Sequence, residues 1–163
     1  MKEPEAGDWA KVFELIRGIR VALLTSVDAD GRFHTRPLQT MEVGADRTLW
    51  FFTAWSSPKV RELHEDVRVS VAYADPARHA YVAITGAGTL VRDPLKAKEL
   101  WRIEQRAYYP DGPADVRLAL LRVDMEQAEY WLAPGPVSYL VAAARATVSG
   151  TPAGIIGENR KTT

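Results

Sequence analysis

The segment from residue 52 to residue 63 carries the side chains best suited to chemistry, because an apolar strand pattern there runs directly into a helix start. Ser57 followed by Pro58 is typical of a helix cap and its first residue. A helix start offers free backbone N–H groups and the positive end of a dipole, which both suit a phosphate. Ser56 adds a second hydroxyl, and Lys59 places a full charge in the first turn, where a cation is unfavourable for the helix itself. The pattern indicates an anion site; the alternative is that Ser57 only caps the helix and Lys59 points into water.

A second cation, Arg36, lies in the middle of a strand pattern over residues 33–42. Because side chains alternate along a strand, Arg36 shares a face with Leu38 and is expected to be partly buried. A buried guanidinium needs a partner, and a phosphate is well matched to it. Pro37 lacks an N–H, which predicts a strand edge or interruption and leaves backbone groups free for a ligand. The alternative partner of Arg36 is a carboxylate such as Glu42.

The remaining residue types exclude several kinds of functional site. The chain has no cysteine, which excludes disulfides and thiolate sites, and its three histidines are too far apart to indicate a metal site. No Ser-His-Asp arrangement and no Gly-rich phosphate loop is found. Several aromatic residues could supply flat walls for a planar heterocycle, although for any one of them filling of the core or of a dimer interface is the favoured interpretation: Trp50, Trp55, Trp101, Tyr108, Tyr109, Tyr130 and Trp131.

Composition narrows the class of partner. The 163 residues contain 21 Lys+Arg and 21 Asp+Glu, so the net charge is zero and neither nucleic acid nor an anionic membrane is expected as a partner. The acidic N-terminus lacks the apolar stretch of a signal peptide, and no uncharged run is long enough to span a bilayer. These features predict a cytoplasmic protein.

The elements that must position these residues are mostly strands. Short helices are predicted over residues 8–18, 57–64 and 93–105, and strands over residues 21–27, 33–42, 48–53, 67–73, 81–91, 118–123, 128–132 and 137–143. Gly86 and Gly88 predict a bend or bulge. Hairpin spacing with only short helices favours a mainly β (α+β) fold, an antiparallel sheet closed into a barrel. We expect one domain over residues 1–148 and a polar, loosely held tail over residues 149–163.

The order of these motifs resembles the pyridoxamine 5′-phosphate oxidase-like superfamily of FMN-binding split barrels. Three short motifs carry the likeness: Arg36-Pro37-Leu38, then Phe52-Thr53, then Ser57-Pro58-Lys59. Trp101, the loop Tyr109-Pro110-Asp111-Gly112, the strand Ala128-Glu129-Tyr130-Trp131 and the closing residues 157–161 are similar to the general stress protein branch. The likeness extends from about Trp9 to Lys161, and it implies a six-stranded antiparallel split β-barrel with short peripheral helices.

The resemblance also implies a cofactor site and a partner. Arg36, Ser57 and Lys59 would hold the FMN phosphate with help from Thr53, and Trp131 would lie near the flavin. The backbone of residues 37–39 would face the edge of the isoalloxazine ring. The expected cofactor-binding residues are Arg36, Pro37, Leu38, Gln39, Phe52, Thr53, Ser56, Ser57, Lys59 and Trp131. FMN is expected ahead of FAD or F420, and the family implies a homodimer with flavin at the interface.

Departures from the family pattern bear on activity. The true oxidase follows its final Trp with an Arg-x-His-Asp-Arg pattern, whereas Trp131 is followed by Leu132 and residues that include neither Arg nor His at these places. Met41 and Pro58 stand where the oxidase has further basic residues. We therefore expect an FMN-dependent oxidoreductase of unknown substrate that is not a pyridoxamine phosphate oxidase. The alternatives are a non-catalytic flavin-binding stress protein, a carrier or sensor, and a split barrel that uses F420 or heme.

Overall fold

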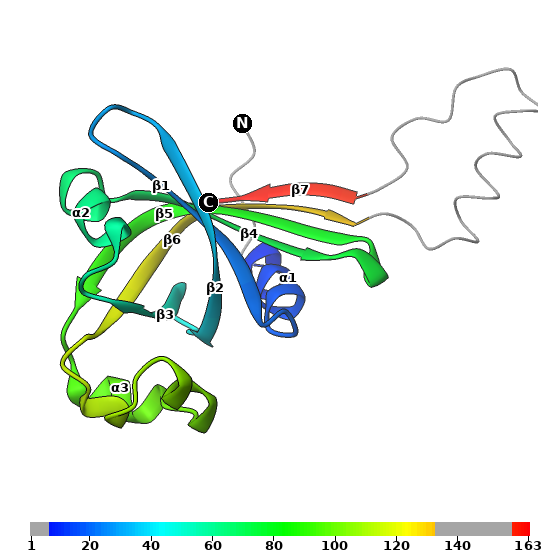
Figure 1. Cartoon of the computed structure of the whole chain (residues 1–163). Helices are drawn as coiled ribbons and strands as arrows, with labels where there is room; N and C mark the ends of the chain where they lie inside the picture. Colours follow the sequence, from blue (N-terminus) through cyan, green and yellow to red (C-terminus); the bar gives the residue numbers. More distant parts are fainter. Residues whose placement is uncertain (1–6, 133–157) are drawn as a thin grey trace, which may run out of the picture.

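The computed structural model describes residues 7–132 and 158–163, which are mainly strands of one antiparallel sheet (Figure 1). The strands are β1 (Val21–Val27), β2 (Phe33–Val43), β3 (Thr48–Ala54), β4 (Arg68–Asp75), β5 (Ala80–Val91), β6 (Leu118–Leu132) and β7 (Glu158–Thr162). The helices are α1 (Gly7–Ile16), α2 (Pro58–Glu65) and α3 (Pro94–Leu100), with 3-10 helices η1 (Pro76–Arg78), η2 (Ile103–Ala107) and η3 (Gly112–Ala114). The strand order is β3-β2-β1-β4-β5-β6-β7, and β3 also pairs with β6, which closes the first six strands into a barrel. The structure confirms the expected mainly β fold, an antiparallel six-stranded barrel with short peripheral helices.

Strand β6 closes the barrel because it is long enough to serve two partners along one edge. Its first half pairs with β3, from Thr48↔Asp124 to Ala54↔Leu118, and its second half pairs with β7, from Ala128↔Thr162 to Leu132↔Glu158. The prediction of two separate strands over residues 118–123 and 128–132 was therefore wrong.

A bulge explains why this long strand is continuous. The register between β5 and β6 shifts so that Thr85 faces Gln127 while Gly86 faces Met125, leaving one extra residue on β6. A Cβ on Gly86 would collide with the carbonyl oxygen of Asp124, so glycine permits the close approach. The bulge expected near Gly86 is confirmed.

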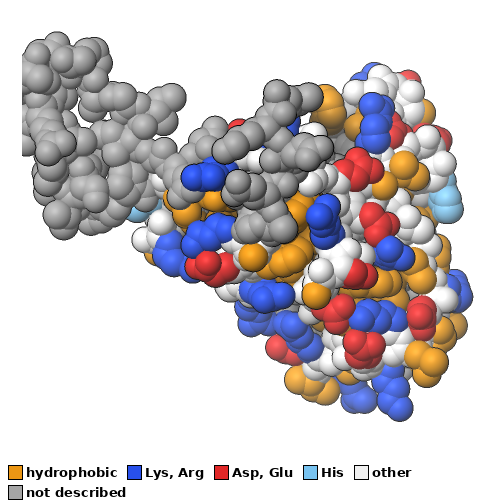
Figure 2. All heavy atoms as spheres, turned by 180° about the vertical axis from the view of Figure 1, so that it is seen from behind, with side chains coloured by type: hydrophobic (Ala, Val, Ile, Leu, Met, Phe, Trp, Pro, Cys, Tyr) orange, Lys and Arg blue, Asp and Glu red, His pale blue; other side chains and the backbone are white. Residues whose placement is uncertain are grey.

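Two buried clusters fill the fold. The larger one lies inside the barrel and joins buried residues of α1, such as Val12 and Ile16, to strand residues such as Phe51 and Leu121. The smaller one packs α3 against β2, β3 and β6 through Met41, Phe52, Leu100, Leu118 and Leu120, among others. On the face shown in Figure 2, acidic and basic side chains are interspersed, which agrees with the zero net charge of the chain.

The C-terminal residues are part of the sheet. The expectation of a loosely held tail is corrected for Glu158–Thr162, because these residues form β7 beside β6 and the side chain of Thr162 is buried. The backbone carbonyl of Thr163 accepts a hydrogen bond from Trp9 Nε1 at 3.3 Å, so the end of the chain is also tied to α1. The strand expected over residues 137–143, and the domain boundary at residue 148, lie outside the described residues. Among the described helices, none is long and apolar enough to cross a membrane.

Candidate functional site

A cavity of about 350 Å³ lies where β2, β3 and the start of α2 meet the segment that follows α3. It brings together seven residues expected from the sequence, which are Pro37, Leu38, Gln39, Phe52, Thr53, Ser57 and Lys59. Met41, Ala54, Gln105, Tyr108 and Tyr109 complete the lining. The other three expected residues, Arg36, Ser56 and Trp131, do not line it.

Lys59 is a buried cation at one end of this cavity. The residue is only 8% exposed, and its Nζ donates to Thr53 Oγ1 at 2.9 Å and to Ser57 Oγ at 2.6 Å. No ion pair among the described residues includes Lys59. Burial, followed by the nearby charge of Arg36, lowers the pKa of Lys59, and the nearby charge of Glu62 opposes this shift. An ammonium group has three N–H donors, so one remains for a ligand in the cavity.

Ser57 serves this ammonium group instead of the helix. It occupies the N-cap position of α2 with an extended backbone, but its side chain makes no capping hydrogen bond and accepts from Lys59. The reading in which Ser57 caps the helix and Lys59 points into water is therefore wrong. No backbone N–H group at the start of α2 donates to the Ser57 side chain, although the Val60 N–H donates to the Ser57 carbonyl at 3.0 Å.

Arg36 lies close behind Lys59 in a buried polar cluster. Its Nη2 donates to Glu62 Oε2 at 2.8 Å, its Nη1 donates to Ser26 Oγ, and Ser26 in turn donates to Glu62. Glu62 is 7% exposed and Ser26 is fully buried. Although burial raises the pKa of Glu62, the hydrogen bonds from Ser26 and Arg36 outweigh it, and the net pKa is lowered. The carboxylate beside Arg36 is thus Glu62, whereas Glu42 pairs with Lys96 at 2.9 Å.

Sequence reasoning did not find Glu62 or Ser26. Glu62 follows Lys59 by three residues on α2, which resembles an ordinary exposed pair on a helix surface. Only the packing of α2 against β1 and β5 shows that its carboxylate is buried against Arg36.

The stretch of β2 beside the cavity has a free edge. β2 pairs with β1 along residues 33–39, but its pairing with β3 begins only at Thr40, opposite Phe51. The edge predicted from Pro37 is therefore confirmed, and the β3-facing backbone of residues 37–39 is not taken up by the sheet. The side chain of Gln39 adds a buried Nε2 group that has no hydrogen-bond partner in the described part of the chain, while its Oε1 accepts from Gln105 Nε2 at 3.0 Å. This edge offers hydrogen-bonding groups to a flat ligand.

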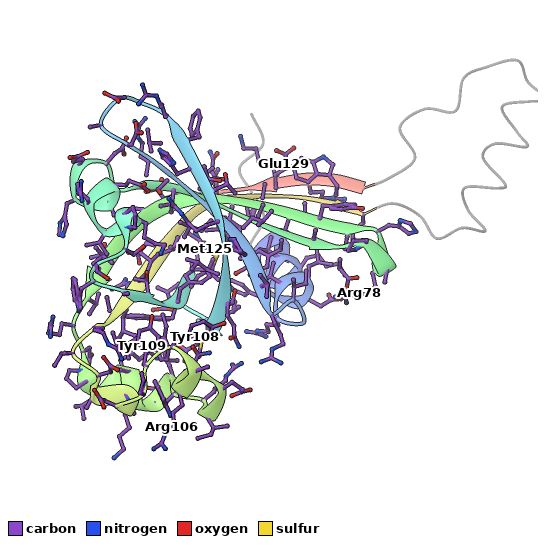
Figure 3. The ribbon with its side chains drawn as sticks, in the orientation of Figure 1. Arg78, Arg106, Tyr108, Tyr109, Met125 and Glu129 are labelled. Carbon is purple, nitrogen blue, oxygen red and sulfur yellow. The ribbon has the colours of Figure 1, made fainter. Side chains whose placement is uncertain are left out.

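The opposite wall comes from the segment after α3. Tyr108 and Tyr109 extend from this segment toward β2 and β3 (Figure 3). Tyr109 is 8% exposed and meets Phe52 edge to face with ring centroids 6.4 Å apart, whereas Tyr108 is 71% exposed. Both tyrosines were expected as candidate aromatic walls, and the loop motif that begins at Tyr109 was the signal that could have placed them at this cavity.

Ser56 and Trp131 both lie outside the lining of the cavity, and Ser56 is exposed in the turn between β3 and α2. Trp131 lies on β6 opposite Tyr81 of β5, and its residue is 38% exposed on the outside of the barrel. It is therefore remote from the lining of this cavity in the same chain.

The described residues contain no group of three or more His, Asp or Glu side chains that could hold a metal ion.

These features define a class of protein, a split antiparallel barrel whose cavity is lined by a buried lysine and by an interrupted strand edge. Comparison with known proteins identifies the family. The family model described as pyridoxamine 5′-phosphate oxidase like matches residues 7–153, and the chain belongs to this family. No curated protein matches the chain.

Solved structures agree with the family and its general stress branch. A general stress FMN/FAD binding protein from Xanthomonas citri is 30% identical, with a TM-score of 0.65 over 75% of this chain and 86% of that one. A general stress protein 26 from Jannaschia sp. CCS1 is 18% identical, with a TM-score of 0.75 over 98% of this chain and 99% of that one. A pyridoxamine 5′-phosphate oxidase-related, FMN binding protein from Nostoc punctiforme is 18% identical, with a TM-score of 0.56 over 81% of this chain and 86% of that one. The resemblance expected from the sequence motifs is confirmed.

Proposed function

We propose that the cavity binds a flavin, FMN in preference to FAD or F420, with its phosphate at Lys59. The observation that carries this proposal is the buried ammonium group of Lys59, which lines the cavity and forms no ion pair among the described residues. A buried cation is stable when an anion completes its surroundings, and a phosphate supplies both charge and acceptor oxygens. The two relatives from Xanthomonas citri and Nostoc punctiforme are described as FMN/FAD binding and FMN binding, which supports the choice of ligand.

The residues of the chain fit such a ligand in two separate ways. Lys59, Ser57 and Thr53 form one hydrogen-bonded group that would hold the phosphate, and the positive charge of Arg36 lies close behind it. The free edge of residues 37–39 and the unpartnered Nε2 of Gln39 would face the flat ring system. A bound flavin would supply reversible acceptance and release of electrons. For Ser56 and Trp131, which do not line the cavity, a cofactor role is proposed from the family resemblance alone.

Within this proposal the protein is an FMN-dependent oxidoreductase of unknown substrate. The second candidate is a carrier or sensor that binds flavin without turnover, and the replacement of the oxidase's Arg-x-His-Asp-Arg pattern after Trp131 favours it. The same replacement argues against oxidation of pyridoxamine phosphate. A cytoplasmic location is part of this proposal, and the absence of cysteine from the sequence is consistent with a reducing compartment.

We further propose a homodimer built on the outside of the barrel. One row of outward residues crosses neighbouring strands, with Leu23 opposite Ala72 and Ala72 opposite Ala83. Leu23 is 49% exposed, and the small side chains beside it leave a flat apolar surface. Sedimentation equilibrium should give twice the 18.1 kDa mass of the chain, and Leu23→Asp should shift this toward the monomer. A wild-type protein that sediments as a monomer would refute the dimer.

A flavin titration tests the cofactor assignment. FMN, FAD, riboflavin and F420 are compared by quenching of their fluorescence on wild-type protein and on Lys59→Met, with Lys98→Met as the control at an exposed position. We expect FMN to bind more tightly than riboflavin, and Lys59→Met to weaken FMN by about 10- to 100-fold, since hydrogen bonds to charged groups contribute about 1.5–3 kcal/mol. Riboflavin, which has no phosphate, should bind both variants equally. Unchanged FMN affinity in Lys59→Met would sink the phosphate assignment.

A further inference from the structure

A second cavity, of about 380 Å³, lies on the other side of Met41 from the first. We call it the arginine cavity, and it is lined by Ile16, Arg17, Ile19, Arg20, Thr40, Met41, Glu42, Val43 and Arg102. Met41 lines both cavities because the β2–β3 register shifts between Thr40 and Glu42, which leaves Met41 as an extra residue in β2. The two cavities are therefore neighbours that share one buried side chain.

The charge of the arginine cavity is strongly positive. Three guanidinium groups, from Arg17, Arg20 and Arg102, line it together with a single carboxylate, Glu42. Glu42 is already paired with Lys96 at 2.9 Å. Arg20 forms an ion pair with Glu104 at 3.5 Å, but both side chains are exposed, so this pair stabilises the fold little.

Two of these arginines have no acidic partner among the described residues. Arg17 lies with its guanidinium 5.7 Å from the ring centroid of Phe13, and it forms no ion pair within the described ranges. Arg102 donates to the backbone carbonyl of Met41 at 3.0 Å. This hydrogen bond holds Arg102 at the wall between the two cavities and leaves its other N–H groups to face a ligand.

The apolar lining of the cavity favours an organic anion. Ile16 and Met41 are buried apolar residues, and Thr40 beside them is buried with its hydroxyl bonded to the hydroxyl of Tyr73 at 2.9 Å. Guanidinium groups beside buried apolar side chains match a molecule that carries a phosphate on an organic body. Guanidinium groups suit phosphate oxygens because their N–H donors are planar and permanently charged.

We propose that the arginine cavity binds the phosphate group of a second reactant, an organic phosphate or diphosphate, next to the cofactor cavity. This goes beyond flavin binding and names the chemical class of the molecule that would meet the flavin. Two sources share this chemistry, a pyridine dinucleotide that donates electrons and a phosphorylated metabolite. The competing explanation is that Arg17, which directly follows α1, only stabilises the C-terminal end of that helix.

The test measures binding of inorganic pyrophosphate by calorimetry in the Lys59→Met protein, where the cofactor phosphate corner no longer competes. We expect saturable binding that is about tenfold weaker in Arg17→Ala and about tenfold weaker in Arg20→Ala, because each variant loses one charge-assisted contact. The matched control is Arg106→Ala, because Arg106 is exposed, forms no ion pair among the described residues and points away from the barrel (Figure 3). Absence of saturable binding, or equal affinity in the Arg17, Arg20 and Arg106 variants, would overturn the proposal.

Further ligands identify the source and separate this proposal from the cofactor assignment. NADPH or adenosine 2′,5′-bisphosphate binding more tightly than pyrophosphate would support a dinucleotide, whereas glucose 6-phosphate binding more tightly than either would support a metabolite. Citrate binding as tightly as pyrophosphate would overturn the choice of phosphate. The Arg17→Ala variant should bind FMN with the same affinity as the wild-type protein. A failure of flavin binding and a failure of the arginine cavity therefore give different results.

Discussion

The two ends of the cofactor cavity are built from different kinds of element. The phosphate corner, which comprises Thr53, Ser57 and Lys59 with the cluster around Arg36 and Glu62 behind it, is hydrogen-bonded throughout, and Thr53, Lys59 and Glu62 are buried. The aromatic wall, which comprises Gln105, Tyr108 and Tyr109, comes from a 3-10 helix and the residues after it.

The corner and the wall differ in how they are attached to the barrel. Two side-chain hydrogen bonds join the segment of the aromatic wall to β2, one from Arg102 to the Met41 carbonyl and one from Gln105 to Gln39. The corner is instead part of the barrel and of α2. A corner of fixed charges suits a group that is the same in every ligand, such as a phosphate, whereas a wall on a surface segment can differ between relatives that share the fold.

The sharpest way to break this comparison is to remove Glu62. Glu62→Ala leaves the guanidinium of Arg36 without its carboxylate, and loss of one partner from a buried pair costs about 3–5 kcal/mol. Since the side chain of Arg36 keeps 22% of its exposure, we expect the free energy of unfolding to fall by about 3 kcal/mol, measured by urea denaturation. Glu65→Ala, at an exposed position of the same helix, is the control and should change stability by less than about 0.5 kcal/mol.

The same variant has a pH dependence whose sign is fixed by the lowered pKa of Glu62. In the folded protein the pKa of the Glu62 carboxyl lies below its ordinary value of 4.5. The carboxylate therefore contributes to stability fully above pH 4.5, and this contribution is lost as the pH falls through the folded pKa. The stability difference between wild type and Glu62→Ala should therefore shrink on acidification. A difference that stays constant down to low pH would contradict a charged pair at Arg36.

The sequence revealed the phosphate corner because one residue there conflicts with its own element. Lys59 in the first turn of a helix is locally unfavourable, and the structure shows that the conflict coincides with a buried ammonium group facing a cavity. Pro37 was informative for the same reason, since a proline cannot complete a sheet ladder and the β2–β3 ladder indeed begins after it.

Contacts between distant segments were beyond such reasoning. Nothing local distinguishes Glu62 from an exposed helix residue, and its partner Arg36 lies 26 positions away on β2. The polar residues around Glu126 resemble a break between two strands, but the bulge opposite Gly86 lets β6 continue through them. Residues 158–162 have little apolar character, so their strand depends on the edge that β6 leaves beyond β3.

The smallest expected effect, and the one that sharpens the comparison most, concerns Tyr108. This side chain is 71% exposed yet lines the cavity, so Tyr108→Ala should leave the free energy of unfolding within about 0.5 kcal/mol of wild type. If its ring lies against a flat ligand, its removal should weaken flavin binding by about tenfold at most, since an aromatic contact contributes about 0.5–1.5 kcal/mol. The loss should be equal for FMN and riboflavin, because the wall contacts the ring system and not the phosphate, whereas Lys59→Met should weaken FMN alone. Tyr108→Phe keeps the ring and should bind like wild type. A Tyr108→Ala variant that loses FMN selectively would show that the wall reads the phosphate too, and the division between a fixed corner and a variable wall would then be wrong.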